Sequence, residues 1–337
     1  MGNSVVDIVP LDTIGEIDGW DRIAASAGCP IFYRSAFLAS IASDPLLESR
    51  AQLLTLRTGG RLDAALPTFS QPQADPIGLL TRLHETFPDL ASRPAILSHC
   101  WHCYDTRLVP FGGAADIRRL MEAFHAQAAA EQAGYFGLIS VSEPAILELM
   151  AQCGLPPRYT NDRFIMDVGH FGGFEDYVAT LHPDIRRELR RQQRLFAASG
   201  ATIAVETPPF DDLDEVVALC RRTAARYAGE FYYPALPTRR LLERLGPGLR
   251  LVSVRVGSVR IGVLVCFFEP PRFHIWAAGM RYDLARFSPY AMSMSEAIRY
   301  AIASGMIRVE GGRGNARIKL KQGFSPLKLY ACIRATS

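Results

Sequence analysis

The chain has 337 residues, of which 49% are hydrophobic and 21% are charged. This length predicts about two domains, and this balance is ordinary for a protein with a sizeable buried core. The longest apolar run, Val263–Phe268, is too short to cross a bilayer, and the first residues lack the pattern of a secretory signal. Seven cysteines, an odd number, indicate a reduced, cytoplasmic protein.

The predicted elements of the first half combine short strands with amphipathic helices. A hairpin is expected where Gln52–Leu56 and Arg61–Phe69 flank Gly59 and Gly60. The other strands are expected at Val5–Val9, Arg107–Pro110 (running into Phe111-Gly-Gly-Ala) and Tyr135–Val141, and the helices at Trp20–Ala27, Phe32–Ile41, Asp116–Gln132 and Pro144–Cys153.

The second half follows a similar plan. A hairpin is expected where Leu249–Val256 and Arg260–Phe268 flank Gly257 and Ser258. The other strands are expected at Arg163–Val168, Thr202–Glu206, Arg272–Ala278 and Met306–Glu310, and the helices at Phe174–Thr180, Asp184–Ser199, Leu213–Tyr227 and Pro289–Ser304. Each half therefore holds a hairpin, then a strand, a loop, a helix and a further strand.

This coarse repeat predicts an α/β protein of the α+β type, built from two units that each have a mostly antiparallel mixed sheet flanked by helices. The turn signal Leu155-Pro-Pro157 suggests a boundary between residues 1–155 and residues 156–337.

Charge is distributed unevenly along the chain. Residues 1–169 carry a net charge of −7 and residues 170–337 one of +10. This asymmetry predicts that the second half meets an anionic partner, such as a phosphorylated cofactor, a nucleotide-linked substrate or RNA. The three lysines, Lys319, Lys321 and Lys328, fall within ten residues, whereas every other basic residue is arginine. Such a cluster favours a phosphate contact, with a solvated strand edge as the alternative.

Two further segments are candidates for anion binding. The predicted helix at Asp184–Ser199 carries five arginines within nine residues, which repel one another unless an anion lies against them, although a solvated basic face is equally compatible. The second segment is the helix start at Ser288-Pro289, preceded by Arg281 and Arg286, where free N–H groups and the helix dipole favour negative charge. Ser-Pro is also simply a good helix start.

Three segments carry a resemblance to a known family. They are Ile185–Leu195, then Ser288–Ile302 followed by Gly305, and last Gly312-Arg-Gly-Asn with Ile318-Lys-Leu-Lys-Gln-Gly-Phe324. With them, residues 160–330 resemble the acyltransferases related to GNAT enzymes and to the Fem-type aminoacyl transferases. Lys321 stands where the family's phosphate-binding lysine would, while Leu320 replaces a frequent aromatic residue and Ser325 a frequent glycine.

The resemblance implies two tandem GNAT-like domains, with a cleft at or near their interface, that transfer an acyl group to an amine. For the phosphates of the donor or substrate it suggests Arg186, Arg187, Arg190, Arg313, Lys319 and Lys321, with Arg281 and the helix start at Ser288 as secondary candidates. Glu230, Tyr233 and Glu310 are candidates for acceptor binding or proton removal, because a carboxylate can pair with an ammonium and an aromatic ring can stack on it. No obligate base is named, since members of the superfamily can use substrate or water for that step.

Metal binding is not predicted. His99-Cys-Trp-His-Cys103 is dense in metal-ligand types, but a structural zinc site needs a second pair of cysteines with similar spacing. A packed segment with buried thiols is the simpler interpretation, and a zinc-dependent protein would contain metal when purified. Tightly bound cofactors are not predicted either.

The leading functional hypothesis is an acyltransferase that forms an amide on a small-molecule amine, taking an aminoacyl group from aminoacyl-tRNA, in the synthesis of a cell-wall precursor or a natural product. An acyl-CoA-dependent N-acetyltransferase is the second hypothesis, although the usual pyrophosphate loop of GNAT enzymes is not evident. The third is a non-catalytic protein that binds tRNA or a nucleotide-linked sugar. The sequence does not predict an oligomeric state.

Overall fold

A computed structural model describes residues 4–109, 113–227 and 229–336. The chain forms two compact units. Unit 1 consists of residues 1–161 and 328–337, and unit 2 of residues 162–327. The last ten residues thus return to the first unit, which a single division near residue 155 does not capture. None of the described helices combines the length and the apolar character that a membrane crossing requires.

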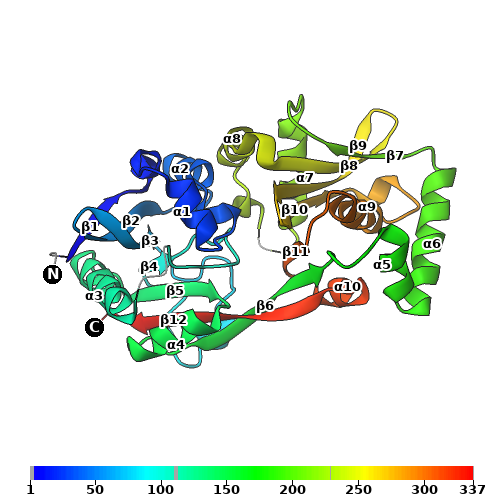
Figure 1. Cartoon of the computed structure of the whole chain (residues 1–337). Helices are drawn as coiled ribbons and strands as arrows, with labels where there is room; N and C mark the ends of the chain where they lie inside the picture. Colours follow the sequence, from blue (N-terminus) through cyan, green and yellow to red (C-terminus); the bar gives the residue numbers. More distant parts are fainter. Residues whose placement is uncertain (1–3, 110–112, 228, 337) are drawn as a thin grey trace. The chain divides into compact units, whose positions relative to one another are not determined.

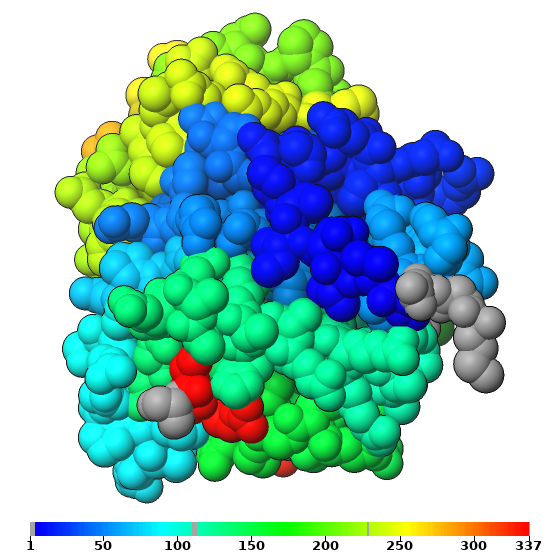
Figure 2. Space-filling model, turned by 90° about the vertical axis from the view of Figure 1, so that its left-hand side faces the viewer, coloured from blue at the N-terminus to red at the C-terminus, as the bar shows by residue number. Residues whose placement is uncertain are grey.

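Unit 1 is built on a sheet with the strand order β1-β2-β3-β4-β5-β12 (Figure 1). All neighbouring pairs are antiparallel except β4 and β5, which run parallel. Figure 2 shows the start of the chain, in dark blue, and its end, in red, at the molecular surface. The strands are β1 (Ser4–Pro10), β2 (Arg50–Thr58), β3 (Arg61–Gln71), β4 (Ala95–Ser98), β5 (Tyr135–Val141) and β12 (Ser325–Ala335), and the helices are α1 (Trp20–Ser26), α2 (Ser35–Ser43), α3 (Ala114–Ala130) and α4 (Pro144–Gln152).

Unit 2 has the strand order β7-β8-β9-β10-β11-β6, again antiparallel except for one parallel pair, β10 and β11. The strands are β6 (Arg158–Asp167), β7 (Thr202–Glu206), β8 (Leu249–Val256), β9 (Val259–Glu269), β10 (Arg272–Met280) and β11 (Arg308–Arg313), and the helices are α5 (Phe174–Thr180), α6 (Pro183–Ala198), α7 (Leu213–Ala224), α8 (Ala235–Leu245), α9 (Pro289–Ala303) and α10 (Ala316–Lys321).

The two units repeat one order of elements. A strand is followed by two helices, three strands, a helix, a strand and a short helix, from β1 to α4 in unit 1 and from β7 to α10 in unit 2. The sixth strand of each sheet lies outside this repeated order. In unit 1 it is β12, near the end of the chain, which pairs with β5; in unit 2 it is β6, which precedes β7 in the chain and pairs with β11. The predicted repeat of two α+β units with mostly antiparallel mixed sheets is therefore confirmed.

Most predicted elements occur within one to three residues of their expected bounds, but four were missed. Helix α8, helix α10, strand β4 and strand β12 were not predicted. The lysine-bearing segment forms α10 and then β12, and Phe32–Ile41 divides into a 3₁₀ turn at Ile31–Tyr33 and α2. At the predicted strand Arg107–Pro110, Val109 makes a single bridge to Ala65, while Pro110 and the following Phe111-Gly112 lie outside the described residues.

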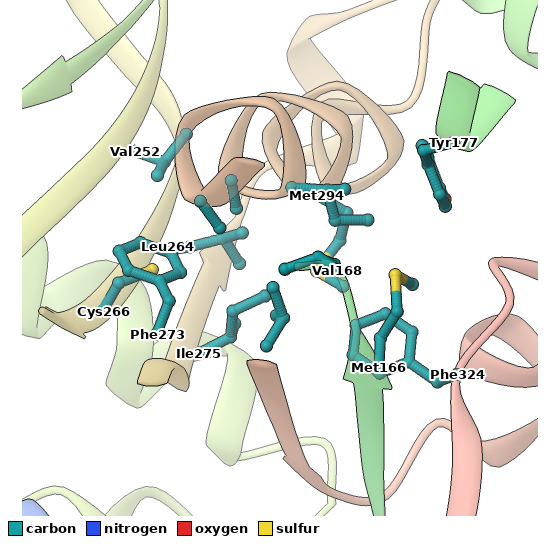
Figure 3. Close-up of a cluster of buried hydrophobic side chains, with 14 of the residues drawn as sticks. Met166, Val168, Tyr177, Val252, Leu264, Cys266, Phe273, Ile275, Met294 and Phe324 are labelled. Atoms are coloured by element: carbon teal, nitrogen blue, oxygen red, sulfur yellow. The ribbon is translucent and has the colours of Figure 1, made fainter. Parts of the chain in front are cut away.

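The core of unit 2 lies between its sheet and α9. In Figure 3, Met294 of α9 lies beside Leu264 and Phe273 of β9 and β10, and Met166 and Phe324 extend the same cluster. All five side chains are at most 4% exposed. Each such burial contributes roughly 1.5–3 kcal/mol of hydrophobic free energy, so the cluster fixes α9 on this face of the sheet.

Two glycines determine how closely helices approach β9 and β10. Gly262 faces Pro289 at the start of α9, whereas Gly279 lies against Leu219 and Cys220 of α7. Because Gly262 pairs with Met280, the residue after Gly279, the two glycines point to opposite faces of the sheet. Helices α9 and α7 therefore cover opposite faces of the sheet.

Gly279→Ala should destabilise the protein by about 1–3 kcal/mol, because the new Cβ would stand 2.5 Å from Leu219 Cβ and force α7 away from β10. Urea denaturation measures the change. Gly173→Ala is the matched control, since no atom lies within 4 Å of the added Cβ there and its backbone is extended. Equal midpoints for the two variants would show that α7 does not pack this closely.

Candidate functional site

The central feature of unit 2 is the separation of its two parallel strands. β10 and β11 pair only at Arg272–His274 and Arg308–Glu310. Beyond Glu310, β11 has one residue more than its other neighbour β6, which makes a bulge at Gly311 and Gly312. Gly312 has a φ of 66°, and a Cβ on Gly311 would stand 2.8 Å from the ring of Phe324, so glycine is required at both positions.

A cavity of about 270 Å³ opens where the strands separate. Its wall is mostly aromatic or small, and among the described residues that line it none is Asp or Glu. The cationic groups are Arg313 and Lys319, and the lining also includes residues of α7 and of the start of α9. Its aromatic members are Tyr227, Tyr232, Tyr233, Trp276 and Tyr290.

Lys319 is the buried cation of this cavity. Its Nζ donates to the carbonyl oxygens of Gly312 at 3.2 Å and Arg313 at 2.9 Å and lies 5.3 Å from the centre of the Phe164 ring. Burial, and secondarily the charge of Arg313, lowers the pKa of Lys319 to about 7. One turn of α10 thus fixes the carbonyl groups of the bulge and places a group that titrates near neutral pH at the cavity wall.

The phenol of Tyr290 and the guanidinium of Arg313 also face the cavity. Burial raises the pKa of Tyr290 to about 12, so its hydroxyl stays protonated, and the side chain of Asn315 is hydrogen-bonded to it. Asn315 has a φ of 51°, a conformation that asparagine tolerates better than most residues. Arg313 Nη2 donates to the Tyr232 hydroxyl at 3.4 Å. These contacts orient a phenol and a guanidinium at the same opening.

Three of the predicted site residues, Tyr233, Arg313 and Lys319, line this one cavity. Tyr233 is 8% exposed, and its ring packs edge-on against Trp276 with the centroids 5.3 Å apart. Lys321, which the family pattern favoured for phosphate, is exposed on α10 and is not part of the lining. The structure thus separates the two lysines that the sequence presents as one cluster.

Glu230 and Glu310 do not join the cavity lining. Glu230 has a 71% exposed side chain and lies 3.6 Å from Arg221 Nη2. Glu310 is buried, with Oε2 3.9 Å from Nη1 of Arg163 on the neighbouring strand. Neither carboxylate has the position that direct proton removal from an amine in the cavity would require.

The arginines of α6 fall into two groups. Arg186 Nη1 donates to the backbone carbonyls of Ala179 and Leu181, both at 2.8 Å, and Arg187 pairs with Asp184. Arg190 and Arg194 are exposed, one turn apart. Arg186 therefore stabilises the junction with α5, and the outer face of α6 presents Arg190 and Arg194 to solvent.

The start of α9 is already hydrogen-bonded within unit 2. Ser288 Oγ accepts from Ala291 N at 3.2 Å, and Ser288 N donates to Gln192 Oε1 at 2.6 Å. Pro289 has no N–H to offer. Arg281, the other secondary phosphate candidate, donates to Asp283 Oδ2 at 3.1 Å. At this helix terminus the N–H groups of Ser288 and Ala291 therefore already have acceptors within unit 2.

Several lining residues were not among the predicted site residues. Trp276 lies on a strand, and Tyr227 and Thr223 lie at the end of α7, so no local motif marks them. Gly314 and Asn315 were visible in Gly312-Arg-Gly-Asn, where glycine and asparagine are the residues that adopt positive φ. For metal binding, no group of three or more His, Cys, Asp or Glu residues in the described ranges could hold an ion.

Comparison with known proteins matches the segment that carries this cavity to a family model. Residues 183–320 match the acetyltransferase (GNAT) domain. The fold is similar to that of FemX, with a TM-score of 0.63, 10% identity and coverage of 94% of this chain and 95% of that one. It is also similar to a tandem GNAT protein of the clavulanic acid pathway, with a TM-score of 0.57, 12% identity and 99% coverage of both chains.

A third similar structure is L-PGS from Bacillus licheniformis, with a TM-score of 0.58, 12% identity and coverage of 95% of this chain and 92% of that one. At these identities the likeness is one of fold. No curated protein matches the sequence. Residues 183–320 thus match the GNAT acetyltransferase domain, and the likeness over both units is a likeness of fold.

The depressed pKa of Lys319 predicts a pH dependence of stability. Between its folded value of about 7 and its ordinary value of 10.5, the unfolded chain binds more protons at this group, so the free energy of unfolding rises with pH. Compared with Lys319→Met, the wild type should gain up to about 1.4 kcal/mol per pH unit across this range. Below pH 7 the difference should be constant.

Chemical denaturation of both proteins from pH 6 to pH 10 measures this difference. Lys321→Met, two residues further on and exposed, is the matched control and should run parallel to the wild type. A Lys319→Met curve that also runs parallel would show that the folded protein leaves the protonation of Lys319 unchanged.

Proposed function

We propose that this acyltransferase moves an aminoacyl group from aminoacyl-tRNA to a small-molecule amine at the cavity of unit 2. The observation that carries the choice of donor is the start of α9. A pyrophosphate is best held by free N–H groups at a helix N-terminus, but here the N–H groups of Ser288 and Ala291 already donate to Gln192 and Ser288. This favours side-chain cations as the partners of the donor's phosphates.

The charge of unit 2 supports a large polyanionic donor. Unit 2 has 24 basic and 17 acidic residues, whereas unit 1 has 13 and 17. Exposed cations lie on α6, at Arg190 and Arg194, and on α10, at Arg317 and Lys321. Such surface cations release counterions when they meet a nucleic-acid backbone. The Fem-like character of the sequence points to the same donor.

The proposed reaction is the aminolysis of an ester. The nitrogen of a neutral amine attacks the ester carbonyl carbon, and a C–N bond forms. The bond from carbon to the terminal ribose oxygen breaks, the amine loses a proton, and the ribose oxygen gains one. The protein has to orient the two substrates, exclude water and move this proton.

We propose Lys319 as the group that moves the proton. A neutral lysine has two N–H bonds and one lone pair, and Gly312 O and Arg313 O accept those two N–H bonds. The remaining tetrahedral position of Nζ then carries a proton or a lone pair according to pH. With a pKa of about 7, Lys319 can accept the proton of the amine and return it to the leaving ribose oxygen.

Arg313 and the aromatic wall have the supporting roles. The guanidinium of Arg313 can stabilise the developing oxyanion or hold the terminal phosphate of the donor. Tyr233 and Trp276 pack edge-on and close one side of the cavity against water. The absence of Asp and Glu from the described lining favours an amine that arrives neutral.

Acyl-CoA is the alternative donor, and one specific observation favours it. The matched family is an acetyltransferase domain, and the tandem GNAT structure of the clavulanic acid pathway is described as being without AcCoA. In that case the donor's phosphates would have to displace Gln192 from the start of α9 or bind elsewhere.

A donor assay separates these proposals. The purified protein is incubated with a panel of small amines and either bulk aminoacyl-tRNA charged with labelled amino acids or labelled acetyl-CoA. We expect amide formation with aminoacyl-tRNA, and prior treatment with ribonuclease should abolish it. Arg313→Gln should lower kcat/KM by about 10²-fold, the usual effect of losing one such electrostatic contact. Transfer from acetyl-CoA alone would reject the aminoacyl-tRNA proposal.

The role of Lys319 predicts the pH profile of the transfer. Because the neutral amine of Lys319 accepts the proton in this proposal, kcat/KM should rise with increasing pH around the pKa of Lys319, about 7. Lys319→Gln should remove this limb and lower the plateau by about 10²–10⁴-fold. Lys321→Gln should keep the limb, whatever its effect on KM. If Lys319→Gln keeps the limb, the titrating group belongs to the substrate.

A further inference from the structure

Large aromatic side chains are exposed around the mouth of the unit 2 cavity. Tyr227 is 78% exposed, Phe231 is 50% exposed and Tyr282 is 49% exposed. We call these three residues the aromatic rim. Exposed aromatic rings gathered at one place on a soluble protein usually indicate a binding surface, because their hydration is unfavourable.

The three rings belong to the same opening. Tyr227 itself lines the cavity, and Phe231 directly precedes Tyr232, which also lines it. Tyr282 lies near Tyr227, and both lie near Tyr290, which lines the cavity. The rim therefore continues the aromatic wall outward, from the end of α7 and from the turn before α9.

The charged side chains next to the aromatic rim are mostly paired with one another. Arg221 lies 3.6 Å from Glu230, and Arg222 and Arg281 lie 3.7 Å and 3.1 Å from the two carboxylate oxygens of Asp283. Arg226 and Arg286 are exposed and add positive charge. The rim thus offers flat neutral rings between compensated charges, with a moderate net positive field.

We infer that the aromatic rim stacks the unpaired bases at the 3′ end of an RNA donor, and so guides its ester into the cavity. This inference rests on the proposed aminoacyl-tRNA donor and names the surface that receives it. Aromatic side chains beside arginine are the common platform for single-stranded nucleic acid, because every base has a π-face. Paired charges suit bases, which are neutral, better than phosphates.

A membrane surface is the other occupant that aromatic and arginine residues can suit. The carboxylates of Glu230 and Asp283 stand among the rim residues, with side chains 71% and 49% exposed. They neutralise part of the positive charge that anionic headgroups would need, whereas the stacking of bases does not depend on that charge. The structure therefore favours RNA over lipid.

A short RNA hairpin with a single-stranded 3′ tail tests the inference directly, measured by fluorescence anisotropy over a salt series. The comparison RNA is the same hairpin with a blunt end. Tyr227→Ala and Tyr282→Ala should each weaken binding of the tailed hairpin by about 5- to 150-fold and leave the blunt hairpin unchanged. Tyr227→Phe keeps the ring and should bind like the wild type.

The salt dependence separates stacking from phosphate contacts. The alanine variants should keep the slope of log Kd against log salt, because they remove no phosphate contact. Arg226→Gln should reduce that slope by about one. Wild-type affinity that does not depend on the tail, alanine variants that bind normally, or preferential binding to phosphatidylglycerol vesicles would each overturn the inference.

Kinetics keep the failure of the rim apart from the failure of the proposed function. If the wild type transfers an aminoacyl group from tRNA and Tyr227→Ala and Tyr282→Ala have an unchanged KM for tRNA, the rim inference is wrong and the donor is right. If the wild type accepts acetyl-CoA alone, the proposed donor is wrong and the rim inference, which rests on it, fails with it.

Discussion

The fixed bulge in β11 is the constraint on which the site of unit 2 depends. β10 and β11 pair over three residues and then separate, because Gly311 and Gly312 add a residue that β6 does not match. A parallel pair that continued would fill this space with backbone hydrogen bonds. The separation leaves carbonyl groups unpaired by the sheet, and two of them, on Gly312 and Arg313, turn to Lys319. The cavity, its cation and the bulge therefore form one structural unit, in which a buried polar backbone finds its partners locally.

Unit 1 shows what happens when the same separation is filled. Its parallel pair, β4 and β5, also ends early, after four residue pairs from Ala95 to Ser98. Beyond that point Thr106 N donates to Ser140 O at 3.0 Å, and Val109 forms a bridge with Ala65. Thr106 and Val109 are fully buried, so the segment that follows β4 occupies the gap in the sheet. The connection from β10 to α9 is shorter and leaves its gap open. One topology thus gives a closed unit and an open one, and the difference lies in a loop.

Local pattern predicted most of the fold, because strands and helices of this chain have clear periodicity and clear turn residues. Length explains one of the missed strands. Strand β4 has only four residues, too few for a pattern to show, whereas β12 has eleven residues and length does not explain why it was missed. The site was predicted only where chemistry is visible in the residue type, as for Arg313 and Lys319. Trp276 lines the same cavity as Arg313 and Lys319 because distant strands pair in the sheet. Ser288 does not line it, and its N–H donates to Gln192 of α6. No local window contains either fact.

The position of Lys319 in the sequence suggests phosphate binding, whereas its surroundings in the structure explain the choice of lysine by desolvation. Proximity along the chain groups Lys319 with Lys321, and both with phosphate. In the structure only Lys319 is buried, and its surroundings offer two carbonyl oxygens and an aromatic ring. A guanidinium there would bring five N–H donors and a charge that it cannot lose, so burial would leave most of them unsatisfied. An ammonium can lose a proton when buried, and the two N–H bonds of the neutral amine match the two acceptors that the bulge provides. Lysine at position 319 is therefore explained by desolvation, and the same desolvation brings its pKa to the range where proton transfer is useful.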